Sequence, residues 1–302
     1  MKTKFSIFFF LPFFLFAFLA SKAQHNSLLD NQGPDEVFNR ILTPEVIVAR
    51  KMKRVTVNVV VKRDGKRLQE TGRKRVYHFT KEGALSWIYE VPFEGSSDST
   101  LIFFYRTADS TYLVKRKTEQ GRFNSTYLKL DSLQRPIQVI HCLETSENES
   151  YRDFKPANQQ VLSKEQIQYS YNGPGQMKKK YLNDDGVVYK EGILYSTLHR
   201  PDKEEISFVA TGTRVVHSYT YDPSGQLSNY QYFTDAMGQY TENLQFTYEN
   251  KRLSGQKFLK NNVPQEERFF FYNNISGLPE SLLIRKTSQY DLVFYNFTYE
   301  FY

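Results

Sequence analysis

Apolar and polar residues alternate with a period of two along most of the chain from about residue 55 onward. Ile167, Tyr169 and Tyr171 share one parity, and the chain ends with the same pattern in Tyr295, Phe297, Tyr299 and Phe301. The intervening positions are mainly Ser, Thr, Asn, Gln, Lys and Glu. Because successive side chains of a β-strand point to opposite faces, this alternation predicts strands with one apolar and one polar face.

The alternating segments recur with a period of about 25 residues. The stretch Tyr219-Thr-Tyr221-Asp222-Pro223-Ser224-Gly225-Gln226-Leu227 has a close partner in Tyr169-Ser-Tyr171-Asn172-Gly173-Pro174-Gly175-Gln176-Met177, and weaker copies lie around Tyr248, Tyr272 and Tyr299. Most successive copies are 24 to 27 residues apart. Asp222-Pro-Ser-Gly225 fits a type I turn that continues into a left-handed glycine and a bulge. Further turns half a period away, at 118–121, 183–186 and 235–238, make each period one hairpin.

These observations predict an all-β fold, an extended antiparallel β-meander of about 25-residue hairpin repeats over residues 55–302, with a possible subdivision near 155. A polar stretch from Glu144 to Leu162 interrupts the period and predicts a long loop. The segment before the array, residues 24–54, contains Thr43-Pro44-Glu45, which is typical of a helix start. We expect a short helix through about Arg50 that plugs one end of the sheet.

The Tyr-x-Tyr-Asp-x-x-Gly-x-Leu pattern around Tyr171 and Tyr221 resembles the YD repeats of Rhs-type proteins, and is more similar to short secreted bacterial proteins with degenerate copies. Large Rhs proteins wind such repeats into a shell around a toxin. This chain has too few repeats to enclose a domain, and no toxin follows the array. The resemblance implies a β-repeat protein.

The first 23 residues have the features of a secretory signal peptide. A short cationic start precedes an apolar run from Phe5 to Ala20, and small residues precede an expected cleavage site after Ala23. An uncleaved anchor is the alternative. After cleavage no transmembrane segment is expected, and no cysteine follows the run to accept a lipid. The sequence therefore predicts an exported protein, periplasmic or extracellular.

Composition limits the chemistry that the chain can carry. There is one cysteine, Cys142, and it cannot by itself build a disulfide framework or a Cys-based zinc site. We interpret it as a buried core residue. The five histidines have no metal-ligand spacing, and no nucleophile elbow or phosphate-binding loop is present. We therefore expect no catalytic residue, no metal and no cofactor.

The strongest charge feature is a basic cluster between residues 50 and 75, with two acidic residues among eleven basic ones. An anionic surface polysaccharide, lipid headgroups or an acidic face of an envelope protein could bind there. Nucleic acid is not expected, because no aromatic residue interleaves the cluster. The structural alternative is a solubilising edge whose charges prevent strand pairing. The cluster consists of Arg50, Lys51, Lys53, Arg54, Lys62, Arg63, Lys66, Arg67, Arg73, Lys74 and Arg75.

Three functional hypotheses remain open from the sequence. The first is an exported, non-enzymatic interaction or scaffolding module of the cell envelope. The second is an outer-membrane β-barrel, although charges fall on both strand faces at 178–180 and the last strand has the wrong phase for a barrel terminus. The third is a protein that binds or hydrolyses a ligand at a site built from separate loops. Trp87 and Tyr89 could then stack on sugars of a carbohydrate ligand.

Overall fold

The computed structural model describes residues 42–92, 100–106, 111–119, 122–133, 135–146, 156–198, 200–235, 240–287 and 291–302. In this part of the chain the regular structure is one short helix, α3 (Pro44–Ala49), and eighteen strands. The strands are β1 (Met52–Lys62), β2 (Gln69–Phe79), β3 (Leu85–Val91), β4 (Thr100–Arg106), β5 (Thr111–Glu119), β6 (Arg122–Leu130), β7 (Pro136–Ser146), β8 (Pro156–Tyr171), β9 (Gln176–Leu182), β10 (Val188–Thr197), β11 (Arg200–Phe208), β12 (Arg214–Tyr221), β13 (Leu227–Thr234), β14 (Tyr240–Glu249), β15 (Arg252–Lys260), β16 (Val263–Tyr272), β17 (Pro279–Lys286) and β18 (Leu292–Phe301).

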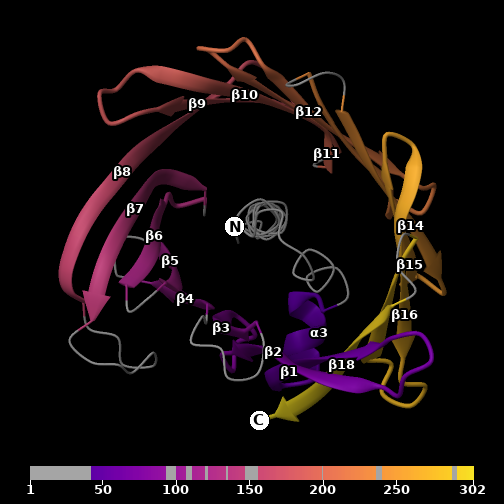
Figure 1. The fold of residues 1–302 in the computed structure, drawn as a ribbon. Helices are drawn as coiled ribbons and strands as arrows, with labels where there is room; N and C mark the ends of the chain where they lie inside the picture. The colour runs from indigo at the N-terminus through magenta and orange to yellow at the C-terminus, as the bar shows by residue number, and fades with distance from the viewer. Residues whose placement is uncertain are drawn as a thin grey trace, which may run out of the picture.

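Each strand pairs antiparallel with the next one along the chain, and β1 also pairs with β18. The sheet therefore closes on itself as a ring, into which Figure 1 looks. The β1–β18 seam is long: it runs from Met52 opposite Phe301 to Lys62 opposite Leu292. The predicted all-β antiparallel meander with a short helix is confirmed, and the structure adds that the meander is closed.

The alternating apolar residues of β1 and of β12 to β18 face the inside of the ring. Ile47 of α3 belongs to the same buried cluster as Val55 of β1, and α3 lies within the ring in Figure 1. Val55 is opposite Tyr299 on one side and Tyr77 on the other, and directly paired residues share a face. Following the pairs around the ring places Tyr221, Tyr248, Tyr272 and Tyr299 on the inner face, whereas Tyr195 of β10 lies on the outer face.

Two apolar clusters stabilise this inner face. One joins α3 to β1, β2 and β3 and is formed by Leu42, Ile47, Met52, Val55, Val57, Tyr77, Phe79, Ile88, Leu128, Leu130 and Leu278. The other covers β13 to β17 and is formed by Leu227, Phe246, Leu253, Phe270, Leu282 and Ile284. Tyr295 and Phe297 of β18 pack against both clusters, so the last strand connects them across the seam.

Helix α3 is found where the sequence predicts it, but it does not plug the ring. Thr43 is the extended N-cap residue, Pro44 occupies the first turn, and the Ile47 amide donates to the Thr43 carbonyl at 3.0 Å. Eighteen strands spaced about 4.8 Å apart make a ring at least about 27 Å across, whereas six helical residues span about 9 Å. The helix packs on the inner wall instead. No helix among the described residues is long and apolar enough to cross a membrane.

The loop predicted from Glu144 to Leu162 is wrong at both of its ends. Strand β7 continues to Ser146, and β8 begins at Pro156 and is sixteen residues long. The polar residues of this stretch form strand because β8 pairs with β7 from Gln138 opposite Gln166 to Ser146 opposite Pro156, and Gln159 donates to the Glu144 carboxylate at 2.9 Å. Since β7 pairs with β8 directly, the sheet is continuous across residue 155. The predicted signal peptide, residues 24–41 and the 235–238 and 118–121 turns lie wholly or partly outside the described residues.

Candidate functional site

The repeated tyrosines form one recurrent polar contact at one end of the ring. This end, here called the turn rim, carries the turns at 80–84, 131–135, 172–176, 222–226, 250–251 and 273–278. In five hairpins, a tyrosine near the end of the second strand donates its hydroxyl to the backbone carbonyl at the start of the first strand. The donor–acceptor pairs, at 2.5–2.9 Å, are Tyr169–Pro136, Tyr221–Pro201, Tyr248–Leu227, Tyr272–Leu253 and Tyr299–Pro279. Each contact fixes the open base of one hairpin.

An arginine completes the unit in three of these hairpins. It is the residue immediately before the accepting carbonyl, and its guanidinium lies over the tyrosine ring. The distances from the guanidinium carbon to the ring centre are 4.4 Å for Arg135 and Tyr169, 5.5 Å for Arg200 and Tyr221, and 5.6 Å for Arg252 and Tyr272. Such cation–π contacts contribute about 0.5–1 kcal/mol each at partly exposed sites.

The glycine of the following turn leaves space for the same guanidinium. Gly225 has φ +82°, and a Cβ atom there would lie 2.2 Å from Nη1 of Arg200. At Gly277 the corresponding distance to Nη2 of Arg252 is 2.7 Å. At Tyr221-Asp-x-x-Gly225 the tyrosine ring and the glycine backbone thus enclose Arg200 of the same hairpin, whereas a Cβ atom at Gly175 would instead lie 2.2 Å from the Ser196 carbonyl oxygen.

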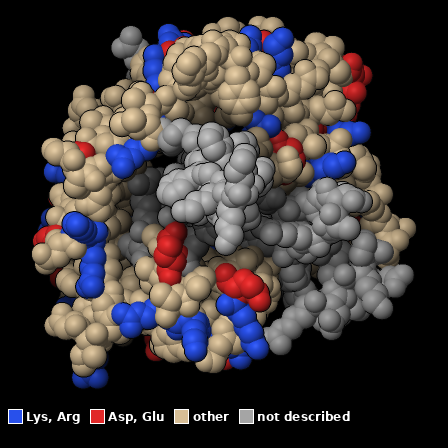
Figure 2. Space-filling view, turned by 180° about the vertical axis from the view of Figure 1, so that it is seen from behind, with Lys and Arg blue, Asp and Glu red and all other residues tan. Residues whose placement is uncertain are grey.

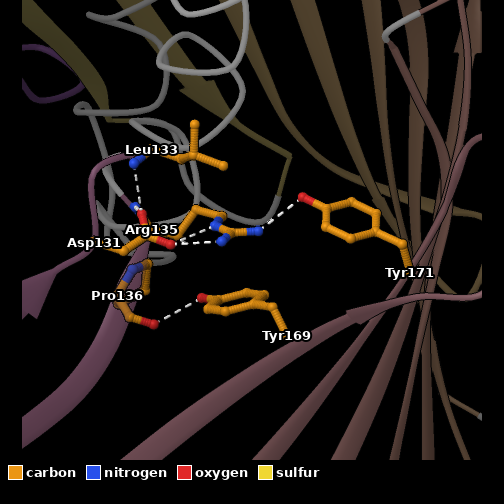
Figure 3. A network of polar contacts seen from close by, with 6 residues as sticks. All are labelled: Asp131, Leu133, Arg135, Pro136, Tyr169 and Tyr171. Atoms are coloured by element: carbon orange, nitrogen blue, oxygen red, sulfur yellow. Dashed lines mark hydrogen bonds and ion pairs between the residues drawn. The ribbon is translucent and has the colours of Figure 1, made fainter.

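Figure 3 shows the unit at the β6–β7 turn. The Asp131 carboxylate accepts hydrogen bonds from the Leu133 and Arg135 amides and pairs with the Arg135 guanidinium at 2.6 Å. The same guanidinium donates to the Tyr171 hydroxyl at 2.7 Å, while Tyr169 donates to Pro136. Aspartate, arginine and both tyrosines of this repeat are therefore occupied by contacts that hold β7, β8 and their turn together.

Burial makes the tyrosines that donate to carbonyls at the bases of the hairpins, the hairpin-base tyrosines, poor acids. Desolvation raises the pKa of Tyr272 to about 12, and it also raises the pKa of Tyr169 and of Tyr299. A phenol with a raised pKa stays protonated at neutral pH and remains a hydrogen-bond donor to its carbonyl. These residues suit a structural role better than proton transfer near neutral pH.

The eleven residues of the basic cluster do not form a single patch. Arg50 lies at the turn rim, where it donates to the Ser276 carbonyl at 2.7 Å. Lys53 and Arg54 both pair with Glu300. Arg75 faces inward and pairs with Glu90 at 3.3 Å, with its side chain 11% exposed. The remaining members are exposed: Lys51, Lys62, Arg63, Lys66, Arg67, Arg73 and Lys74.

Four of these exposed residues gather at the end of the ring opposite the turn rim. Lys62 ends β1, and Arg63, Lys66 and Arg67 follow in the loop to β2; these four are called the basic tip. Arg63 lies 3.9 Å from Asp291, and the other three make no ion pair within the described part of the chain. On the face shown in Figure 2, by contrast, basic and acidic side chains are interspersed.

The other chemistry-bearing residues have ordinary contacts. Cys142 is 1% exposed, and burial raises the pKa of its thiol, so its predicted core position is confirmed. Trp87 stacks on His78 with 5.0 Å between ring centres, which occupies one of its faces. The buried Glu144 accepts hydrogen bonds from Ser125, Tyr127 and Gln159. Across the described residues, no group of three or more His, Cys, Asp or Glu is placed to hold a metal ion.

Polar and charged side chains occupy outward positions in the last half of β18 and in β9. Outward positions of β18 carry Asn296, Thr298 and Glu300, while Tyr295 and Phe297 face inward. The three lysines at 178–180 divide between the faces: Lys178 pairs outside with Glu191, and Lys179 pairs inside with Glu204 at 2.6 Å. The outer face at these positions of β9 and β18 is therefore polar and charged.

Sequence reasoning missed two features. The first is the arginine of the hairpin-base unit, although the dipeptide Arg-Pro at 135–136 and again at 200–201 was a usable signal. The second is an apolar row on the outer face of β16, β17, β18 and β1, described below. Its residues lie on different strands, and only the strand register aligns them.

Comparison with known proteins finds no matching family model and no matching curated protein. Among solved structures, a porin-like protein from Bacteroides uniformis is 10% identical, with 82% of this chain and 98% of that chain covered and a TM-score of 0.40. A LolA superfamily protein from Nitrosomonas europaea is 11% identical over 85% and 92% of the two chains, with a TM-score of 0.15. The MucA/MucB complex of Pseudomonas aeruginosa gives 9% identity over 89% and 94%, with a TM-score of 0.18.

Proposed function

We propose that this chain is an exported, non-enzymatic interaction module of the cell envelope that binds an anionic partner through the basic tip. The observation that carries the proposal is the exposure of Lys62, Lys66 and Arg67 without an ion pair in the described chain. The tip carries four cations against the exposed Asp64 in the same loop. A net positive cluster of this kind attracts polyanions and accelerates their association.

The hairpin-base units support the non-enzymatic part of this proposal. Their tyrosine, arginine and aspartate side chains are engaged in holding adjacent strands, as at Asp131 and Arg135. The raised pKa of Tyr272 opposes a role as a proton acceptor near neutral pH. The side chains of these units are therefore occupied by structural contacts, whereas the cations of the basic tip are exposed.

Retention on immobilised dextran sulfate tests the proposal with a defined polyanion. Reversing the charge of Lys62, Lys66 and Arg67 to Glu should lower the salt concentration of elution substantially, because each lost cation weakens a screened electrostatic contact. A matched control replaces Arg122, Lys129 and Lys164 with Glu, since all three are exposed and lie on other strands. Equal elution of both triple variants contradicts the proposal.

A further inference from the structure

An apolar row crosses the outer face of the ring beside the basic tip. Phe269 of β16 is opposite Leu283 of β17, Leu283 is opposite Phe294 of β18, and Phe294 is opposite Val60 of β1. Directly paired residues share a face, so the four side chains form a continuous line on the outside. Phe271 and Leu292 lie on the same face one step to either side of this line.

These six residues, called the outer apolar patch, are accessible. Phe269 is 38% exposed and Phe271 is 48% exposed, while Val60, Leu283 and the others are half-buried. The position opposite Phe269 on β15 is Gly255, which has no side chain, and the Arg285 guanidinium carbon lies 5.9 Å from the centre of the Phe269 ring. Phe269 and Phe271 are exposed on either side of the buried Phe270, and exposed apolar patches of this kind mark interaction sites.

Lys62 and the ion-paired Arg285 border this patch on the side of the basic tip. Two residues beyond the row, Leu292 is flanked by Lys62 on β1 and Arg285 on β17. The carboxylate of Glu267 is paired with Arg285 and that of Asp291 with Arg63. The opposite border is neutral, with side chains from Asn58, Ser281 and Asn296. The patch and the tip together are apolar and aromatic at one end and cationic at the other.

We propose that the outer apolar patch and the basic tip together bind the surface of an anionic phospholipid bilayer. Aromatic side chains are stable at the boundary between headgroups and acyl chains, and lysine and arginine pair with the phosphates while their stems remain in apolar surroundings. A hydrophilic polyanion needs only the cations, whereas a bilayer also covers Phe269, Phe271 and Phe294. The inference rests on the proposed function, because it names the anionic partner of the same basic tip.

Sedimentation with vesicles tests this assignment. The full mature chain should bind vesicles of equal parts phosphatidylglycerol and phosphatidylcholine, and should bind phosphatidylcholine vesicles much more weakly. Replacing Phe269 and Phe271 with Ser should weaken binding to the anionic vesicles about tenfold or more, since two partly buried aromatic rings are lost. The matched control replaces Val161 and Leu162 with Ser, two apolar residues that are 57% and 55% exposed on β8.

The outcomes separate this inference from the proposed function. The Phe269→Ser/Phe271→Ser variant should keep its retention on dextran sulfate, and circular dichroism should show an unchanged β-sheet spectrum. Anionic-vesicle binding that is equal in this variant and the Val161/Leu162 control overturns the bilayer assignment. Retention on dextran sulfate without any vesicle binding by the natural sequence also overturns it, while the proposed function stands. Loss of both activities in the basic-tip variant supports both.

Discussion

Removal of a single phenolic hydroxyl, in the Tyr272→Phe variant, tests the role of the hairpin-base unit. Tyr272 donates to the Leu253 carbonyl at 2.8 Å, and its ring lies beneath the Arg252 guanidinium. Phenylalanine keeps the ring, its burial and most of the cation–π contact, so the substitution removes the hydrogen bond almost alone. It breaks the contact at the base of the β15–β16 hairpin.

The expected cost is about 1 kcal/mol in the free energy of unfolding, the usual net contribution of one intramolecular hydrogen bond. The half-buried position of Tyr272 favours a value within the common range of about 0.5–1.5 kcal/mol. The matched control is Tyr195→Phe. Tyr195 faces outward on β10, and its hydroxyl makes no hydrogen bond within the described residues, so its removal should change stability by less than about 0.5 kcal/mol.

Urea unfolding of the two variants and the natural sequence, followed by circular dichroism, measures these differences. Alkaline titration of tyrosine absorbance gives a second readout. Because the folded pKa of Tyr272, about 12, exceeds the ordinary value of 10, its contribution to stability is complete below pH 10 and is lost as the pH rises toward 12. The Tyr272→Phe variant should lose one late-ionising tyrosine. Equal stability of Tyr272→Phe and Tyr195→Phe would refute the structural role of the unit.

Two further predictions concern a turn and a buried carboxylate. Both Gly225 and Gly186 have positive φ, so an alanine at either position should cost about 1–2 kcal/mol in backbone strain. Gly225→Ala should destabilise the fold more than Gly186→Ala, because only its methyl group would collide with Arg200. Equal urea midpoints for the two variants would contradict the enclosure of the arginine. Burial raises the pKa of Glu165, so ionisation of this carboxyl costs stability as the pH rises through its folded pKa. Glu165→Gln should therefore match the natural sequence below pH 4.5 and exceed its stability at neutral pH, and equal stability at both pH values would show that burial imposes no such cost.

The local structure could be predicted because its causes are local. Alternation at 295–301 defines a strand with an apolar face, and Asp222 with Gly225 defines a turn whose Gly225 amide donates to the Asp222 carbonyl at 2.8 Å. The turn at 183–186 likewise has the Gly186 amide bonded to the Asn183 carbonyl at 3.0 Å. These contacts span a few residues, so sequence pattern is sufficient for them.

The rest depends on contacts between distant segments. Nothing in the alternation of β1 distinguishes an edge strand from one that pairs with β18, since both need the same residues. Closure follows from the accumulated twist and tilt of the whole sheet. The basic cluster looked continuous in sequence, yet successive residues of β2 point to opposite faces, so Arg75 turns inward while Lys74 is exposed. The polar composition of the β8 segment near Gln159 predicts a loop. The segment forms a strand because it pairs with β7, and its own composition does not reveal that partner.

The seam between the first and last strands has a consequence for biogenesis. Val55 meets Tyr299, so the final hydrogen-bonded ladder forms between segments separated by nearly the entire polypeptide. During synthesis, β1 has an unpaired edge until β18 has been made, and such edges readily recruit other chains. Pairing between two strands this far apart in the sequence forms slowly during folding. The nascent protein therefore gains from any factor that shields β1 until the C-terminus arrives, and C-terminal truncation should produce aggregation.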